Sequence, residues 1–359
     1  MSNVGQSNRG ALDLSGGRPY RVERLVRDEG VGRGSPVLEV RNPGGLSLDL
    51  LLDRAMDIGW ADDGRSRLAW TAPPGFPNPL AYDPSGFGWK KTFGGGLLAT
   101  CGLVNTGRPS VWSGHPYGLH GRIGHLPATN VLWRERPPSD GIPSRARRVV
   151  EGGGTDPACL EGSWLEISAD VLESELGGPL LVLRRQVLVA IGHPTVIVRD
   201  RVVNRGDQPC PHMFRHHINL GAPLIANGTV ISSDARPFAD REGGRLDEGF
   251  LPLRLSTSEG HEDERVSYLE AGGQEIAATC VRNDEAGFQC RIVQETEGFP
   301  MTILWRDASA STNILGVEPS TSGDGGLDEA REQGRLIMLD PDETREYVTL
   351  IQVQPLVPR

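Results

Sequence analysis

Hydrophobic and polar residues alternate along much of the second half of this 359-residue chain. The alternation is clear at residues 164–171, and two apolar, β-branched runs follow at 180–190 and 195–203 around a His-Pro turn at His193. Successive side chains of a strand point to opposite faces of a sheet, so this pattern predicts strands with one buried face. Shorter runs with the same character continue to the end of the chain: 276–282, 287–294, 301–306, 335–339 and 347–353. Their spacing is typical of antiparallel β-structure.

The first half of the chain adds a hairpin and a long loop. Residues 37–40 and 46–52 flank the turn sequence Asn-Pro-Gly-Gly at 42–45, which predicts two paired strands. Residues 60–95 are rich in Pro, Gly and Trp and predict a long functional loop, and residues 236–265 predict a charged surface loop. No repeat, linker or long helical pattern interrupts the chain. We therefore predict an all-β fold, a single large antiparallel β-sandwich over 19–359 behind a flexible N-terminal tail at 1–18.

Charge and cysteine content narrow the functional classes. The net charge is −10 and the isoelectric point is near 5.4, which argues against a nucleic-acid or anionic-membrane surface. No apolar run approaches the roughly 18 residues that a membrane helix needs. The five cysteines are scattered and odd in number, which favours free thiols and a cytoplasmic location, although Cys280 and Cys290 could face each other across a hairpin.

The most distinctive stretch is residues 214–221, which contains the adjacent pair His216 and His217. On a strand the two imidazoles must face opposite ways, so they cannot share one role. A histidine on the open face of a sheet can donate a proton near neutral pH. The plainer alternative is one buried histidine that is only hydrogen-bonded and one that is exposed.

Other polar groups stand in unusual surroundings. His120, Arg122 and His125 lie among glycines, where the backbone can approach a ligand closely. Glu318 ends an apolar run, and a buried carboxylate is costly without a partner or a task. Three tryptophans could stack on the apolar face of a ligand or simply fill the core: Trp89, Trp112 and Trp305.

Five short motifs, in this order, resemble the aldose 1-epimerase (galactose mutarotase-like) superfamily, and in particular a bacterial branch of unassigned substrate. They are Leu51-Leu52-Asp53-Arg54-Ala55-Met56-Asp57-Ile58-Gly59, Gly95-Gly96-Leu97-Leu98-Ala99-Thr100-Cys101-Gly102-Leu103, Leu119-His120-Gly121-Arg122, His217-Ile218-Asn219-Leu220-Gly221 and Gly316-Val317-Glu318-Pro319. The resemblance covers about residues 35–355. It implies a β-supersandwich with a sugar site on its concave face.

The resemblance also implies roles for individual residues. His217 matches the family's general acid and Glu318 its general base, while His120 and Arg54 match groups that hold substrate oxygens. We add Arg122, Asn219 and Trp305 as candidate substrate-binding residues. The chain departs from the galactose-specific branch at Gly118-Leu119, where an Asn-rich motif is expected. The family's substrate-binding aspartate has no secure match, and the candidates are Asp240, Asp263 and Glu264.

These features predict a cytoplasmic, cofactor-free enzyme that interconverts the anomers of a free monosaccharide or a derivative. Its partner is then a small sugar, not a nucleic acid or a membrane, and a homodimer stays open. Two other classes remain: a metal-dependent sugar isomerase using some of His120, His125, His212, His216 and His217, and a non-catalytic sugar-binding protein. No compact metal-ligand spacing supports the first, and an acid and base pair is unnecessary in the second. A phosphorylated sugar could be held by Lys90, Lys91, Arg54 or Arg122, although at most one of the two adjacent lysines would line a pocket. The identity of the sugar and anomer stays open.

Overall fold

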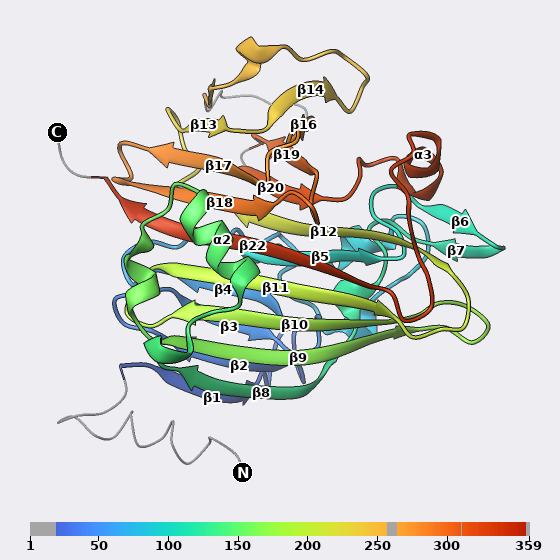
Figure 1. Ribbon diagram of the computed structural model, residues 1–359, viewed down its shortest axis with the longest axis horizontal. Helices are drawn as coiled ribbons and strands as arrows, with labels where there is room; N and C mark the ends of the chain where they lie inside the picture. Colours follow the sequence, from blue (N-terminus) through green and yellow to red (C-terminus); the bar gives the residue numbers. More distant parts are fainter. Residues whose placement is uncertain (1–18, 257–263, 310, 357–359) are drawn as a thin grey trace.

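Two large antiparallel sheets face each other in the computed structural model, which describes residues 19–256, 264–309 and 311–356 (Figure 1). The predicted tail at 1–18 lies outside these residues. The first sheet has eleven described strands, ordered β1 (Arg21–Val26), β2 (Pro36–Arg41), β3 (Ser47–Leu51), β4 (Asp57–Asp62), β5 (Leu98–Leu103), β12 (Cys210–Leu220), β20 (Ile314–Ser320), β19 (Met301–Asp307), β16 (Arg265–Glu270) and β14 (Arg236–Asp240), with β21 (Ile337–Leu339) paired to β12.

The second sheet has nine described strands. Their order is β15 (Leu253–Arg254), β13 (Val230–Ser233), β17 (Ile276–Asn283), β18 (Phe288–Glu295), β22 (Thr344–Pro355), β11 (Thr195–Asn204), β10 (Leu180–Ala190), β9 (Trp164–Ser174) and β8 (Ala128–Arg136). A separate hairpin pairs β6 (Ser110–Trp112) with β7 (His115–Tyr117).

Helices are few and short in the described residues. α2 (Ser144–Gly152) lies over the outer face of the second sheet, where Val149 and Val150 pack with residues of β10, β11 and β22 (Figure 1). The others are α3 (Gly326–Glu332) and the 3₁₀ turns η1 (Pro79–Ala81), η2 (Gly88–Lys91), η3 (Ile123–His125), η4 (Pro138–Asp140), η5 (Pro157–Glu161) and η6 (Glu248–Phe250). The absence of a long helical pattern in the sequence agrees with this content.

The alternating pattern of the sequence becomes the core between the sheets. In β10, Val187 and Val189 are buried and join the cluster that β2, β3, β5 and β18 complete. Antiparallel register places Val187 opposite Val198 of β11 and Ile167 of β9, so apolar residues meet across three strands. The all-β, antiparallel sandwich predicted from the sequence is confirmed.

Two details of the prediction are wrong. Residues 236–265 were predicted as a loop because they are rich in charge, but they contain the two short strands β14 and β15. Cys290 pairs with Val281, whereas Cys280 pairs with Arg291, so the two thiols do not face each other across the hairpin. The register is offset by one residue, which turns neighbouring side chains to opposite faces.

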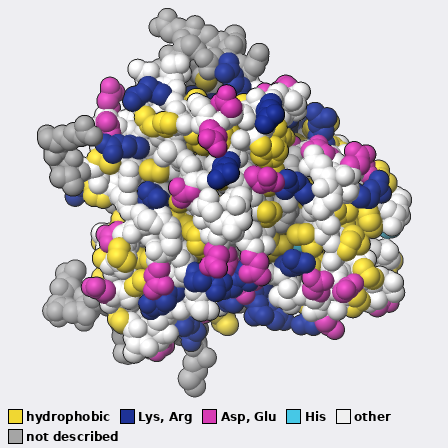
Figure 2. Space-filling view, turned by 45° about the horizontal axis from the view of Figure 1, so that its top comes forward, with side chains coloured by type: hydrophobic (Ala, Val, Ile, Leu, Met, Phe, Trp, Pro, Cys, Tyr) yellow, Lys and Arg dark blue, Asp and Glu magenta, His cyan; other side chains and the backbone are white. Residues whose placement is uncertain are grey.

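Acidic and basic side chains are interspersed on the face that Figure 2 presents, without a single-sign field. A net charge of −10 is therefore not concentrated there. Among the described residues, no helix is long and apolar enough to cross a membrane.

Candidate active site

The two adjacent histidines of β12 face opposite sides of the first sheet. His216 lies between the sheets, with Nε2 2.7 Å from Oδ2 of Asp200 on β11 and Nδ1 2.9 Å from Oγ1 of Thr349 on β22. His217 consequently points to the outer face of the first sheet, away from the second one. The prediction that the two imidazoles have different roles is thus matched by different surroundings.

A cavity of about 790 Å³ lies over this outer face, and His217 lines it. Its size is within the range of about 300–1,000 Å³ that is typical of small-molecule sites. Side chains reach it from β12, β19 and β20, and from the segments that follow β4 and β5. The charged, imidazole and aromatic residues that line it are Lys90, Arg108, Arg215, Arg241, Glu242, Glu264, Asp307, Glu318, Asp324, His120, His217, Trp70, Phe87, Trp89, Phe93 and Trp305.

His217 and Glu318 are in direct contact. The register that pairs Ile218 with Val317 sets His217 on β12 opposite Glu318 on β20, and His217 Nε2 lies 3.2 Å from Glu318 Oε1. Both side chains are almost fully buried. Residues about 100 positions apart in the sequence therefore form one acid and base pair at the base of the cavity.

Arg215 holds the other oxygen of Glu318. It precedes His217 by two residues, so strand alternation places both side chains on the same face. Its Nη1 lies 3.0 Å from Glu318 Oε2 and 2.6 Å from Oδ1 of Asp324, and its Nη2 donates to the carbonyl of Gly323. One buried guanidinium thus fixes two carboxylates of the cavity.

Burial shifts the pKa values of the central pair toward their uncharged forms. It raises the pKa of Glu318 to about 8; the charge of Arg215 opposes this rise and that of Asp324 adds to it. Burial, and then the charge of Arg215, lowers the pKa of His217 to about 3. Near neutral pH the unliganded pair is therefore a carboxylic acid beside a neutral imidazole.

His120 forms a second imidazole in the cavity wall, 6.0 Å from His217 between ring centroids. It has a left-handed backbone with φ of 58°, and the Gly107 N–H donates to its Nδ1 at 3.2 Å. Burial, and next the charge of Arg215, holds the pKa of His120 well below its usual value. Its neutral ring therefore carries the proton on Nε2, which is a hydrogen-bond donor.

Aromatic rings form one wall beside His217. Phe93 and Trp305 have ring centroids 5.3 and 5.4 Å from the His217 ring, and Trp89 stacks on Phe93 at 4.2 Å. Nε1 of Trp305 is buried and has no hydrogen-bond partner among the described residues. Such a wall suits the apolar face of a sugar ring. Trp112 lies elsewhere, on the β6–β7 hairpin.

Three predicted substrate-binding residues do not line this cavity. Arg54 donates to the carbonyl of Pro77 and lies in a small hollow on the other side of Trp89 and Phe93. Arg122 reaches away to Glu173, and its Nη2 donates to the carbonyl of Ser174. The buried amide of Asn219 donates to the carbonyls of Gly96 and His217. Of the seven residues assigned to catalysis or substrate binding from the sequence, the cavity brings together His217, Glu318, His120 and Trp305.

The sequence missed several residues of the cavity. Of the candidate acids, Glu264 lines it, Asp240 does not, and Asp263 lies outside the described residues. Asp324 takes the prominent position instead, in a Gly-rich segment shortly after Glu318. Strand alternation could have identified Arg215, because it lies two residues before His217 on the same strand. No local sequence pattern pointed to Asp324.

The family comparison matches most of the chain. The model described as "Domain of unknown function (DUF4432)" covers residues 32–143 and 159–353. The chain belongs to the DUF4432 family. No curated protein matches it in a sequence search.

Solved structures show the same fold as this DUF4432 chain at low sequence identity. A proposed aldose 1-epimerase from Klebsiella pneumoniae has a TM-score of 0.76 and 22% identity, covering 93% of this chain and 83% of its own. A galactose mutarotase-like protein from Clostridium acetobutylicum has a TM-score of 0.59 and 12% identity, and the match covers 93% of this chain and 98% of that one. A proposed mutarotase from Salmonella typhimurium has a TM-score of 0.60 and 12% identity, and the match covers 93% of this chain and 94% of that one. The galactose mutarotase-like fold implied by the sequence motifs is thus confirmed.

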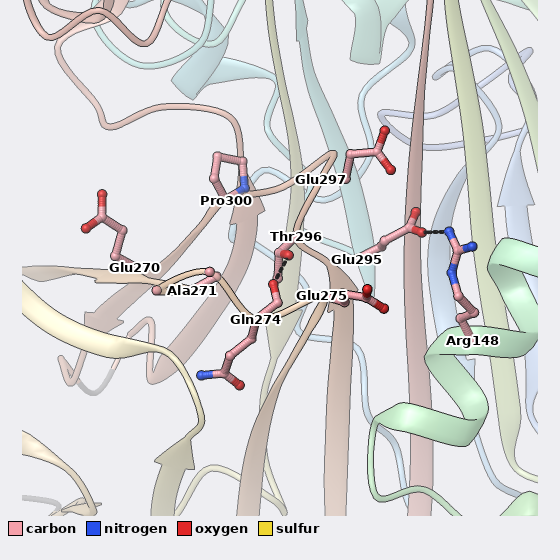
Figure 3. Close-up of a pocket in the computed structure, with 11 residues that line it drawn as sticks. Arg148, Glu270, Ala271, Gln274, Glu275, Glu295, Thr296, Glu297 and Pro300 are labelled. Atoms are coloured by element: carbon pink, nitrogen blue, oxygen red, sulfur yellow. Dashed lines mark hydrogen bonds and ion pairs between the residues drawn. The ribbon is translucent and has the colours of Figure 1, made fainter.

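A second hollow of about 710 Å³ in this DUF4432 chain has different chemistry (Figure 3). Several of its polar side chains already have partners: Glu295 points to Arg148 of α2, and Thr296 donates to the carbonyl of Gln274. No histidine lines it. The acid and base pair therefore distinguishes the cavity over β12 as the candidate active site.

The metal reading has no support in the described part of the chain, where no group of three or more His, Cys, Asp or Glu side chains is arranged to hold an ion. His125 and His212, two of the candidate ligands, lie apart from the cavity: His125 contacts Thr92, and His212 contacts Tyr347.

Proposed function

We propose that this protein is a carbohydrate mutarotase that interconverts the anomers of a free monosaccharide or a close derivative. The observation that supports the proposal is the 3.2 Å contact between His217 Nε2 and Glu318 Oε1 at the base of a cavity of about 790 Å³. General acid and base catalysis needs groups with pKa values near the working pH, and burial moves the pKa of Glu318 to about 8.

One acid and one base are enough to balance the protons of the reaction. Ring opening removes a proton from the anomeric hydroxyl and adds one to the ring oxygen. Glu318 as carboxylate takes the first proton, and His217 as imidazolium gives the second, which leaves a carboxylic acid and a neutral imidazole. After the aldehyde carbon rotates, ring closure runs both transfers in reverse and regenerates the starting pair. No proton or electron is left over.

The pKa values favour the uncharged pair in the unliganded site. This is the state that performs ring closure: Glu318 protonates the carbonyl oxygen while His217 accepts the proton of the ring-forming hydroxyl. A proton moved across the 3.2 Å contact converts one state into the other, so the pair serves both half-reactions. Each transfer contributes typically about 10²–10⁴-fold to a rate.

The other lining groups would orient the sugar. The His120 Nε2–H and the Trp305 Nε1–H are donors for substrate oxygens, and Asp324 and Glu264 are acceptors for hydroxyl protons. Trp89 and Phe93 give the sugar ring an apolar surface. A polar wall opposite an aromatic wall holds a sugar by both of its faces.

Two-dimensional exchange NMR on a panel of free sugars tests the proposal. We expect cross-peaks between α and β anomers that grow with protein concentration and persist after treatment with EDTA. Substitution of His217→Asn should lower the exchange rate at least a hundredfold. No protein-dependent exchange on any sugar, or exchange that EDTA abolishes, would contradict the proposal and favour a binding protein or a metal-dependent isomerase, respectively.

A further inference from the structure

Two positive side chains of the cavity have no anionic partner among the residues that the structure describes. Lys90 is on η2, and Arg108 follows β5; both are exposed and both line the cavity. The ammonium of Lys90 lies over the ring of Phe87, with Nζ 6.0 Å from its centroid. Two unpaired positive charges at one cavity are available to a ligand.

The other two positive groups of the cavity are neutralised within the protein. Arg215 contacts Glu318 and Asp324. Arg241 lies 3.7 Å from Glu242 and 3.2 Å from Glu264. These paired guanidiniums hold the structure of the site and contribute little free charge.

The unpaired charges also lie on the same side as the His120 donor. Gly107, whose N–H donates to His120 Nδ1, directly precedes Arg108, and the charge of Lys90 acts on the His120 ring. The lining from residues 70–120 has Lys90 and Arg108 as its only Lys, Arg, Asp or Glu side chains. All the acidic lining residues come from 242–324. Asp324 also lies on this side, since its carbonyl accepts from the Arg108 N–H, but its carboxylate is paired with Arg215.

We propose that Lys90, Arg108 and the Nε2–H of His120 bind an anionic group on the substrate, so that the substrate class is a monosaccharide carrying a phosphate or a carboxylate. This inference rests on the proposed function and names its substrate. A guanidinium presents paired donors to an oxyanion, and an ammonium adds a point charge. The Glu318–His217 pair, whose imidazole lies 6.0 Å from the His120 ring between centroids, then acts on the anomeric centre.

The sequence provides a matched control. Lys90 and Lys91 are the only two lysines in the chain. Lys91 pairs with Asp83 at 3.3 Å and does not line the cavity. Lys90→Gln and Lys91→Gln therefore remove the same charge one residue apart, with only the first at the proposed anion site.

The first experiment measures the binding of inorganic phosphate by ³¹P NMR line broadening. We expect Arg108→Gln to raise the dissociation constant about tenfold and Lys90→Gln to raise it several-fold, in line with the loss of a charge-assisted hydrogen bond. Lys91→Gln should stay within twofold of the unmodified protein. Absence of binding, or equal effects of Lys90→Gln and Lys91→Gln, would overturn the proposed site.

The second experiment compares anomer exchange of glucose 6-phosphate, glucuronate and glucose. We expect kcat/KM for one anionic sugar to exceed that for glucose at least tenfold, with the preference lost in Arg108→Gln; the better of the two identifies phosphate or carboxylate. Equal exchange of neutral and anionic sugars would overturn the substrate class and leave the mutarotase proposal intact. Phosphate binding that depends on Arg108, with no exchange of any sugar, would overturn the mutarotase proposal and leave the anion site intact.

Discussion

Arg215 and Asp324 form a partly buried ion pair with 2.6 Å between Nη1 and Oδ1, and the same nitrogen lies 3.0 Å from Glu318 Oε2. One positive charge is thus shared by two carboxylates. Asp324 has a lowered pKa, because the charge of Arg215 outweighs the effect of burial, and its negative charge raises the pKa of Glu318. The ion pair therefore tunes the carboxyl group that moves the proton.

The first prediction concerns the pH dependence of this tuning. Asp324→Asn removes a negative charge next to Glu318 and leaves Arg215 with Glu318 as its one carboxylate contact. Both changes favour ionised Glu318, so its pKa should fall from about 8. We expect the falling limb of kcat/KM against pH, measured by exchange NMR, to move to lower pH, because the pair loses its one proton above the pKa of Glu318.

Asp307→Asn is the matched control for that experiment. It makes the same change in the same cavity, but Asp307 has no contact with Arg215 in the described structure. The limb should stay in place in this variant. If the limb stays in place or moves to higher pH in Asp324→Asn, Asp324 does not act on Glu318 through Arg215.

The second prediction concerns the buried charges behind the site. Asp200 accepts two hydrogen bonds from Arg185, at 2.9 and 2.7 Å, and contacts His216. Asp200→Asn leaves a buried guanidinium short of negative charge, which typically costs about 3–5 kcal/mol of unfolding free energy. Urea denaturation measures this loss.

Asp170→Asn is the control for this second prediction. Asp170 is partly exposed and lies 3.9 Å from Arg184, so its loss should cost less than about 1 kcal/mol. A loss of similar size in both variants would contradict a special role for the buried cluster that supports β12.

The third prediction links the site to stability. Glu318 has a pKa of about 8 in the folded protein, against an ordinary value of 4.5, so the folded state holds its proton more tightly than the unfolded chain does. The stability contributed by this bound proton is complete below pH 4.5 and is lost as the pH rises to about 8. Since glutamine has no such proton, Glu318→Gln should gain in unfolding free energy relative to the unmodified protein across this interval.

Denaturation in urea at pH 5 and pH 8 measures the third prediction. Glu332→Gln, which removes an exposed carboxylate on α3, is the surface control. If the difference between Glu318→Gln and the unmodified protein is the same at both pH values, the proposed pKa shift of Glu318 is wrong.

Strand periodicity explains which parts of the site the sequence could predict. His217 and Glu318 lie on regular strands, where alternation and register determine the direction of each side chain. The same rule separates His216 from His217 and places Arg215 beside the latter. The roles of His217 and Glu318 were implied by the family motifs, and their contact depends on the pairing of two strands that lie far apart in the sequence.

Loop residues could not be placed in the same way. Arg54 begins a turn in which Ala55 and Met56 have positive φ angles of 53° and 57°, and its side chain turns to the carbonyl of Pro77. His120 has a left-handed backbone, so Arg122 does not follow it into the cavity. Non-glycine residues adopt positive φ only where the surrounding structure requires it, and sequence periodicity contains no such information.

The most direct test of the central claim is the anomer-exchange rate of Glu318→Gln, measured by NMR with a substrate found in the sugar panel. Because the amide cannot accept the anomeric proton, we predict a loss of about 10²–10⁴-fold in the rate. Sugar binding, measured by calorimetry on the same sample, should stay within a few-fold of the unmodified protein. A rate within tenfold of that of the unmodified protein, with binding intact, would contradict the assignment of Glu318 as the group that moves the proton.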